Sequence, residues 1–342
     1  MIPTPTTPKE LDDLISTPND KVVDVVHNLP GRFAVLGAGG KMGFHVSKML
    51  QRALLVAGRD ERVITVSRFS DPDKREQFER AGFEVIAADL AESDQVAALP
   101  DATNIISLAA IKFGTSGQPD LLQRINITTS QHVTERYRDS RIAMLSTGCV
   151  YAFTSPESGG STEDSPVDPP GEYARSRVDQ ERVFIEASAG NSTRVVLIRL
   201  NYSIDLRYGV LLDVAQNVLN RKPVDVTMGY ANVIWQGDAA ARIIQSLIYA
   251  ATPAVPLNIT GPGTLKIREL AQAFGNRFGI KPTITGSEGK VAWLNNASKS
   301  HAMFGLPAVS LDQMIEWVAT WLERGGVTLN KPTHFEARGE GY

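Results

Sequence analysis

Short apolar runs alternate with stretches of helical periodicity from residue 32 onward. Turn residues bound each run, and the runs cover residues 33–37, 63–67, 83–87, 104–109, 142–147 and 195–200. Parallel strands that are covered on both faces appear as continuous apolar runs, because neither side of the strand meets solvent. The pattern therefore predicts an α/β fold with a doubly wound parallel sheet of about six or seven strands.

The flanking sequence divides the chain into four segments. Residues 1–31 form an N-terminal helical extension, where apolar positions over 9–29 predict one or two short helices. Residues 32–200 carry the alternating core. After Asn201 the rhythm loosens into helices at 213–220, 237–251 and 267–278, separated by Pro/Gly turns such as 253–256. Residues 201–325 are predicted to form a smaller, non-contiguous lobe with returning core segments, and 326–342 a polar tail that wraps the surface or frays.

Composition narrows the class of protein. Hydrophobic residues make up 42% and charged residues 21% of the chain, close to the globular average. A net charge of -3 without any Lys/Arg-rich run argues against nucleic acid as a partner. A single cysteine, Cys149, excludes an internal disulfide and suits the cytoplasm, and no signal peptide or membrane span is expected. The five histidines lack ligand spacing, so no metal site is expected.

Glycines cluster where the first apolar run ends. The segment reads Gly37-Ala38-Gly39-Gly40-Lys41-Met42-Gly43. Gly37 permits a tight turn, Gly39 and Gly40 let the backbone approach phosphates, and Gly43 lets helix and strand pack closely. A glycine turn with only a structural role is the alternative, but this one opens the βαβ series. We therefore predict a Rossmann-type dinucleotide-binding core over 32–200 and a mainly substrate-binding lobe over 201–325.

The end of the second run bears on which dinucleotide binds. An NAD site usually offers a carboxylate there for the ribose hydroxyls, but this chain has Ser67-Arg68. A guanidinium matches phosphate geometry, and Lys41 in the turn adds a second positive charge. These residues favour NADP, with NAD as the other possibility. Alternatively, Arg68 is a solvated charge at a strand end.

Further motifs follow in a set order along the core. They are Asp89-Leu90 after the third run, Ala109-Ala110 after the fourth, Asn126 in the next helix, Thr147 at the end of the fifth run, and Tyr173 in the helix beyond it. In this order the chain resembles the extended short-chain dehydrogenase/reductase family of NAD(P)-dependent sugar epimerases, dehydratases and reductases, over about residues 32–325. The resemblance implies that the first five of these residues, with the glycine turn, contact the cofactor.

The same resemblance assigns the chemistry. Thr147 lies at the position of the family's catalytic hydroxyl, and Tyr173 at the position of its acid/base. Hydride transfer at a carbinol or carbonyl carbon requires the oxygen to exchange a proton in step, and a tyrosine with a pKa of about 10 needs a nearby cation for this. Trp235 resembles a residue near the family's substrate pocket, which makes it a candidate pocket residue.

The sequence also departs from the family. Arg177 replaces the family's lysine four residues after Tyr173, which keeps the charge but puts the ribose contacts and the proton relay in doubt. Lys112 is a candidate substitute cation, or a simple exposed lysine. Asn201 falls one residue before the family's substrate-side asparagine and is a candidate substrate contact.

One difference narrows the reaction. Family members that dehydrate nucleotide sugars place acids directly after the catalytic threonine, where this chain has Gly148 and Cys149. Dehydration is therefore disfavoured. Cys149 is either a structural thiol or a nucleophile, and no histidine lies close in sequence to activate it.

These observations predict an NAD(P)-dependent oxidoreductase or epimerase that acts on a sugar or sugar-acid derivative. A non-catalytic NADP-binding sensor of the same fold remains the alternative, because Arg177 departs from the catalytic pattern. The resemblance further implies a homodimer through helices at 120–137 and 172–189, whose apolar positions include Leu121, Leu122, Ile125, Val178, Val183 and Phe184. Packing of these positions on the chain's own sheet is the competing interpretation.

Overall fold

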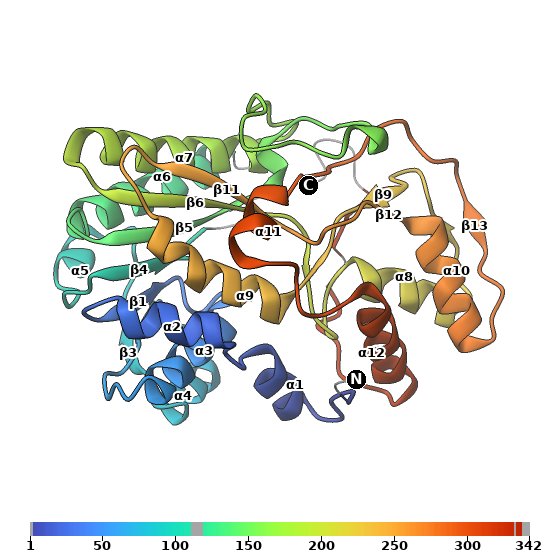
Figure 1. Cartoon of the computed structure of the whole chain (residues 1–342), viewed down its shortest axis with the longest axis horizontal. Helices are drawn as coiled ribbons and strands as arrows, with labels where there is room; N and C mark the ends of the chain where they lie inside the picture. The colour runs from blue at the N-terminus through green and yellow to red at the C-terminus, as the bar shows by residue number, and fades with distance from the viewer. Residues whose placement is uncertain (1–2, 111–118, 332, 337–342) are drawn as a thin grey trace.

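A parallel seven-stranded sheet forms the centre of the molecule (Figure 1). The computed structural model describes residues 3–110, 119–331 and 333–336, with only the backbone for 119–123. In the order β11-β6-β5-β4-β1-β2-β3, the strands are Val255–Ile259, Arg194–Leu200, Arg141–Thr147, Asn104–Ser107, Phe33–Leu36, Ile64–Ser67 and Glu84–Ala87. Neighbouring strands pair in parallel throughout, which confirms the doubly wound fold.

Helices cover both faces of this sheet. Alternate residues of β1 point to opposite sides, so that Phe33 and Val35 join one apolar cluster, and Ala34 and Leu36 join the other. The first face carries α2 (Asp20–Asn28), α3 (Gly43–Val56), α4 (Pro72–Arg80) and α9 (Gln236–Gln245). The second face carries α5 (Ser93–Ala97), α6 (Pro119–Arg136) and α7 (Glu172–Asn191). Burial on both faces explains why inner strands such as β1 are continuously apolar, whereas the edge strand β3 is only partly buried.

One edge of the sheet differs from the sequence prediction. The sequence predicts a turn over residues 253–256, but Val255 and Pro256 begin β11, which pairs with β6. The prediction is wrong because it rests on proline as a local turn signal. Proline is tolerated in an edge strand, where its missing N–H can face away from the neighbouring strand.

A second apolar cluster lies beyond the carboxyl ends of the strands, on the right of Figure 1. Its main helices are α8 (Val210–Leu219), α10 (Ile267–Phe278) and α12 (Leu311–Glu323). Three two-stranded pairs frame it: β7 (Ser203–Ile204) with β10 (Ile234–Trp235), β8 (Val224–Asp225) with β13 (Ile284–Thr285), and β9 (Tyr230–Ala231) with β12 (Leu265–Lys266). Helix α11 (Ser298–Phe304) returns to the sheet near β11. This is the smaller, non-contiguous lobe that the sequence predicts.

The N-terminal helices pack against both parts of the molecule. Helix α1 (Pro8–Ile15) begins at Thr7, whose hydroxyl accepts a hydrogen bond from the backbone N–H of Glu10 at 3.1 Å. Leu11 and Ile15 are fully buried in the cluster of the second lobe, whereas α2 packs on α3 and α9 of the sheet. In Figure 1, α1 lies between α3 and α12. The extension therefore connects the two parts.

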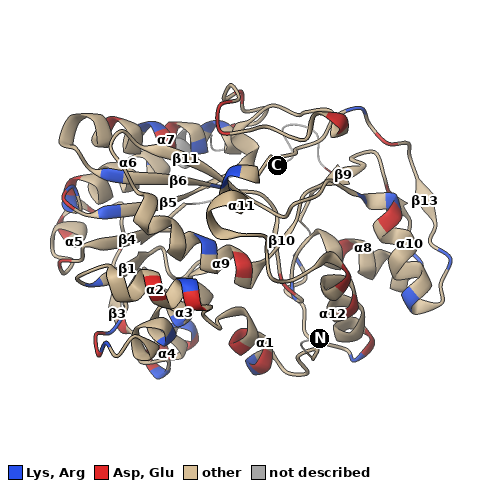
Figure 2. Ribbon diagram, in the orientation of Figure 1, with Lys and Arg blue, Asp and Glu red and all other residues tan. Residues whose placement is uncertain are grey.

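Basic and acidic residues are interspersed along the ribbon (Figure 2). Within residues 3–110, 119–331 and 333–336, no helix has the length and apolarity needed to cross a membrane. The same described residues contain no cluster of three or more His, Cys, Asp or Glu side chains that could hold a metal ion.

Candidate functional site

The glycine turn lies at the carboxyl end of β1. Gly37 has φ +75°, and its N–H donates to the carbonyl of Val66 on β2 at 2.9 Å. A Cβ on Gly43 would lie 2.1 Å from the carbonyl oxygen of Ala38, and one on Gly39 would lie 2.5 Å from Oγ of Ser67. Side chains at these positions would collide with protein atoms, so the glycines keep the turn close to β1 and β2. This geometry forms a cradle that fits a pyrophosphate.

Helix α3 starts directly from this turn, at Gly43. Its first backbone N–H groups have no intrahelical partner, and the helix dipole favours an anion there. Met42 precedes the helix, and Lys41 donates from Nζ to the carbonyl of Ser203 at 3.1 Å while lying over the Tyr208 ring. Gly39, Gly40, Lys41, Met42 and Gly43 all line one cavity of about 750 Å³. The predicted phosphate-binding segment therefore faces a cavity of ligand size.

A lysine that the sequence analysis did not single out lies near the glycine turn. Arg68 is exposed and does not line the cavity. Lys74 of α4 does line it, together with Gln77, and donates a hydrogen bond from Nζ to the carbonyl of Gly39. Ser67 lies beside Gly39. The sequence signal that could have drawn attention to Lys74 is its position in the first turn of α4, the helix that follows β2.

The remaining predicted cofactor residues differ in whether they reach the cavity. Ala110 lines the cavity, and the backbone of Ala109 lies against Gly37. Asp89 accepts a hydrogen bond from the backbone N–H of Ala91, and Leu90 is buried in the core; neither lines the cavity. Asn126 of α6 is buried and donates to Oγ of Ser176 on α7 at 3.4 Å. Lys112 falls outside the described residues.

Thr147 and Tyr173 come together at the carboxyl end of β5. Thr147 Oγ1 accepts a hydrogen bond from the backbone N–H of Cys149 at 3.2 Å, and its hydroxyl lies close enough to the Tyr173 phenol to lower the pKa of that group. Both side chains line the cavity. Burial raises the pKa of the Tyr173 phenol above its usual value, against the opposing effects of the Arg177 charge and the Thr147 hydrogen bond. The phenol is therefore a proton donor at neutral pH unless further positive charge is bound nearby.

Arg177 lies one turn after Tyr173 on α7 and is 3% exposed. Its two terminal nitrogens donate to Oε1 of Gln180 and to the carbonyl of Leu145, while Nε is buried without a hydrogen-bond partner in the described structure. Burial lowers the Arg177 pKa. Hydrogen bonds to Gln180 and Leu145 thus fix the guanidinium, and its charge acts on Tyr173 without a direct hydrogen bond.

Of the predicted substrate contacts, Asn201 lines the cavity and Trp235 does not. The Asn201 amide donates to Asn295 Oδ1 at 2.8 Å and to the carbonyl of Trp293 at 3.2 Å. The Trp235 indole is 2% exposed and packs edge-on against Trp317 at 5.0 Å between ring centroids. Cys149 is buried and lines the cavity.

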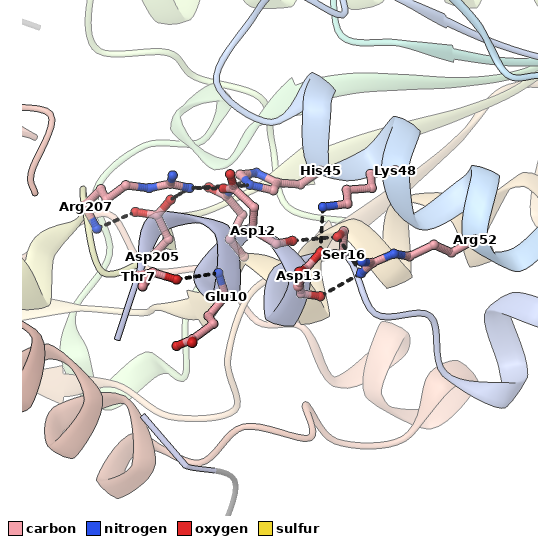
Figure 3. A network of polar contacts seen from close by, with 11 residues as sticks. Thr7, Glu10, Asp12, Asp13, Ser16, His45, Lys48, Arg52, Asp205 and Arg207 are labelled. Atoms are coloured by element: carbon pink, nitrogen blue, oxygen red, sulfur yellow. Dashed lines mark hydrogen bonds and ion pairs between the residues drawn. The ribbon is translucent and has the colours of Figure 1, made fainter. Parts of the chain in front are cut away.

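Sequence analysis missed a second group of cavity residues. Asp12 of α1, His45 of α3 and the loop residues Asp205 and Arg207 form a polar network on one wall (Figure 3). Near them, Lys331 and Thr333 of the C-terminal segment also line the cavity. These residues are far apart in sequence and follow no motif.

The fold and the glycine cradle define a Rossmann-type dinucleotide-binding protein with a Thr-Tyr pair in the same cavity. Comparison with family profiles agrees, since the profile described as "NAD dependent epimerase/dehydratase family" matches residues 33–209. Because this match covers more than half of the 342 residues, the protein belongs to the NAD-dependent epimerase/dehydratase family. The matched region contains the sheet up to β6, Thr147 and Tyr173, but not α1.

Solved structures of known proteins share the fold at low sequence identity. A UDP-glucose 4-epimerase from Thermus thermophilus in complex with NAD has a TM-score of 0.68 and 18% identity, covering 85% of this chain and 99% of that one. A dTDP-glucose 4,6-dehydratase from Streptomyces venezuelae with NAD bound has a TM-score of 0.70 and 19% identity, covering 86% and 98%.

A short-chain dehydrogenase/reductase superfamily protein from Agrobacterium tumefaciens with bound NAD also has a TM-score of 0.70, at 16% identity, covering 86% and 98%. No curated protein sequence matched the chain. Identities this low establish the common fold, and the reaction must be argued from the site.

Proposed function

We propose that the protein is an NAD(P)-dependent oxidoreductase or epimerase acting on a hydroxyl or keto carbon of a sugar or sugar-acid derivative. The observation that carries this proposal is that Thr147 and Tyr173 line the same cavity as the glycine turn. Family membership supports a nicotinamide cofactor, which supplies or accepts the hydride when bound. Residues 39–43 and the start of α3 would hold its phosphates.

Tyr173 acts as the acid/base in this proposal. When a ketone is reduced, the phenol gives its proton to the developing alkoxide oxygen; when an alcohol is oxidised, the phenolate takes the hydroxyl proton as the C–H bond yields its hydride. Thr147 donates a hydrogen bond to the same oxygen. Arg177 favours the phenolate through its charge, since it lowers the pKa of Tyr173.

The tight packing around Gly148, the residue after Thr147, supports oxidoreduction or epimerisation over dehydration. A Cβ on Gly148 would lie 2.5 Å from Oδ1 of Asn295 and 3.0 Å from Cβ of Asn201. An acidic side chain at this position would displace a buried hydrogen-bonded pair. Cys149 is buried beside Ala174 and Trp293, which leaves it as a packing residue.

We propose NADP as the preferred cofactor. Lys74 lines the cavity and donates to the carbonyl of Gly39, which lies beside Ser67, so one cation lies on the cavity wall next to the glycine turn. Arg68 follows Ser67 at the strand end, exposed and outside that wall. NAD binding is the alternative, and the known structures described above contain NAD.

A homodimer through α6 and α7 also remains a proposal. These two helices pack on one another, and Phe184 is buried in the chain's own core. Ile125, Val178 and Val183 are partly exposed, and Ile185 is 43% exposed, so an apolar strip remains for a partner helix. The side chains of Leu121 and Leu122 lie outside the described residues. Light scattering should give twice the chain mass at micromolar concentration, and a monomer would refute the proposal.

A cofactor-binding sensor is the second candidate function. It is favoured by the engagement of Arg177 with Leu145 and Gln180, and by the raised pKa of Tyr173. To test both candidates, the co-purifying nucleotide should be identified and sugars and sugar acids screened for a change in nicotinamide absorbance. Turnover that depends on Tyr173 supports the enzyme, whereas tight nucleotide binding without turnover of any sugar supports the sensor.

A further inference from the structure

Segments near both ends of the chain meet one loop on the cavity wall, at residues 203–209. Figure 3 shows the N-terminal contact, in which Asp12 lies beside Arg207. From the N-terminal side, Asp12 Oδ1 accepts a hydrogen bond from Nη2 of Arg207 at 2.8 Å. From the C-terminal side, the N–H of Leu329 donates to the carbonyl of Arg207 at 3.0 Å. Arg207 is therefore the common contact of α1 and the C-terminal segment.

Two further helices fix Asp12, α3 directly through His45 and α9 through a contact to that histidine. Oδ1 of Asp12 lies 2.8 Å from Nε2 of His45 on α3, and Nδ1 of His45 lies 2.8 Å from the side-chain amide of Gln236 on α9. Burial raises the pKa of the Asp12 carboxyl, but the hydrogen bond to His45 and the charge of Arg207 outweigh it, and the pKa is lowered overall. Asp12 is thus an ionised, fixed support for Arg207.

The loop also fixes Arg207 from within. Its backbone N–H donates to Oδ1 of Asp205 at 2.8 Å, and its Nη2 lies 3.5 Å from Oδ2 of the same carboxylate. The Arg207 side chain is only 16% exposed and lines the cavity. In the described part of the chain, Nε and Nη1 of Arg207 donate no hydrogen bond, so these donors remain available to a ligand.

The charge of the cavity is unbalanced. Its described lining contains five cationic side chains and two carboxylates, and both carboxylates, Asp12 and Asp205, already contact Arg207. Lys331 of the C-terminal segment is one of the cations, and Thr333 anchors that segment through two hydrogen bonds to Asp213 at 2.5 and 2.9 Å. Lys41 belongs to the glycine turn and Lys74 donates to the carbonyl of Gly39, where the proposed cofactor phosphates would bind. Arg207 borders the first turn of α3, since its Nη2 lies 3.4 Å from Nε2 of His45, and both α1 and Leu329 contact it on the cavity wall that Lys331 also lines.

We propose that Arg207, positioned by Asp12, binds the carboxylate of a sugar-acid substrate, and that α1 and residues 329–333 form the substrate side of the cavity. This inference rests on the proposed function, because it supplies the substrate class for the reaction at Thr147 and Tyr173. A guanidinium with free donors beside an ammonium group is suited to a compact anion. The diphosphate of a nucleotide sugar is the competing anion that the experiment distinguishes.

Calorimetry on the cofactor-loaded protein tests the inference. The probes are D-galacturonate, neutral D-galactose and UDP-galactose, which share the sugar and differ in the anion. Arg207→Gln should weaken galacturonate binding by about 10- to 100-fold, as expected for one lost hydrogen bond between charged groups. Asp12→Asn should weaken it by about 3- to 10-fold, because the guanidinium keeps its charge but loses its support. Neither change should alter the affinity for D-galactose.

Asp13→Asn is the matched control. Asp13 is the neighbouring carboxylate of α1 and pairs with Lys48 and Arg52 of α3, but it does not line the cavity. Asp13→Asn removes a carboxylate from the same helix but leaves the Asp12 contact with Arg207 in place, so galacturonate affinity should stay at the wild-type value. Circular dichroism and cofactor affinity show whether each variant folds.

The outcomes separate this inference from the proposed function. Equal galacturonate affinity of Arg207→Gln and wild type, or wild-type preference for D-galactose or UDP-galactose, would overturn the carboxylate site. If such a protein still turned over a sugar through Tyr173, the proposed function would stand. If galacturonate bound through Arg207 but no sugar or sugar acid were turned over, the site would stand and the proposed reaction would fail.

Discussion

The proposed cofactor side and the proposed substrate side of the cavity are built in different ways. On the proposed cofactor side, residues 37–43 form the cradle within a single turn, and Thr147 and Tyr173 lie on β5 and α7 of the core. On the substrate side, Asp12, Arg207 and Lys331 come from the start, middle and end of the chain. Local sequence specifies the first side, whereas the second depends on how the ends of the chain fold back.

This difference implies that the two sides respond differently to mutation. A side chain added at a glycine of the cradle would displace the backbone of the turn, and the strands packed around the turn permit little movement. A change at Asp12 or Arg207 acts through side-chain contacts between separate elements. The cofactor side should therefore be intolerant of added atoms, and the substrate side sensitive to lost charges.

The largest expected effect is the loss of the acid/base. Tyr173→Phe should lower turnover by roughly 10² to 10⁴-fold, the range for a positioned proton transfer, while cofactor affinity stays nearly unchanged. Steady-state kinetics and cofactor titration check this. Tyr249→Phe is the control, since Tyr249 is 37% exposed and packs against Phe304, away from the cavity. Equal turnover of Tyr173→Phe and wild type on a confirmed substrate would contradict the mechanism.

A smaller but still large effect is expected from filling the cradle. In Gly43→Ala the new Cβ would lie 2.1 Å from the Ala38 carbonyl oxygen, so the turn must move. We expect a loss of about 1–3 kcal/mol in stability, typical of overpacking, and about 10-fold weaker cofactor binding. Denaturant melts and fluorescence titration measure the two quantities. Gly190→Ala, where no atom lies within 4 Å of the added Cβ, should bind cofactor as wild type does.

An effect of comparable size is expected on cofactor preference. Lys74→Ala should weaken NADP binding by about 10- to 100-fold and change NAD binding little, the loss expected for one hydrogen bond to a charged group. Arg68→Ala should act in the same direction but less, because Arg68 is exposed and off the cavity wall. Arg75→Ala, on the same helix but paired with Glu79, serves as the control. Unchanged NADP affinity in Lys74→Ala would remove this lysine from the cofactor site.

The smallest expected effect is a shift in pH dependence. Arg177 lowers the pKa of Tyr173, so Arg177→Met should raise that pKa further. Because oxidation needs the phenolate, the pH-rate profile of the oxidation should move to higher pH. Arg177→Lys keeps the charge and should retain the wild-type profile. A profile that stays in place in Arg177→Met would show that the guanidinium does not act on Tyr173.

The sheet could be predicted from the sequence because its signals are local. Strands buried on both faces are apolar throughout, and the six expected runs coincide with β1 to β6 within a few residues. The seventh strand was missed, since Pro256 reads locally as a turn and only pairing with β6 makes it an edge strand. The glycine turn was recognisable because strand, turn and helix are contiguous.

The substrate side could not be predicted in the same way. Asp12 and Asp13 look alike on α1, and only the packing of that helix places one at the cavity and the other against Lys48. Trp235 follows a recognisable pattern, yet the structure buries it against Trp317. Contacts between elements separated by more than 190 residues, such as Arg207 with Asp12, leave no periodic signal in the sequence.

The attachment of both chain ends to the loop at 203–209 has a consequence for thermal inactivation. Terminal segments open more readily than a central sheet, because fewer buried contacts hold them. If α1 or residues 329–333 detach on warming, Arg207 loses its fixed position while the sheet remains folded. Catalytic activity should then be lost at a lower temperature than the circular dichroism signal of the sheet. A saturating substrate should bring the two temperatures together, because it binds only the form in which both segments are attached.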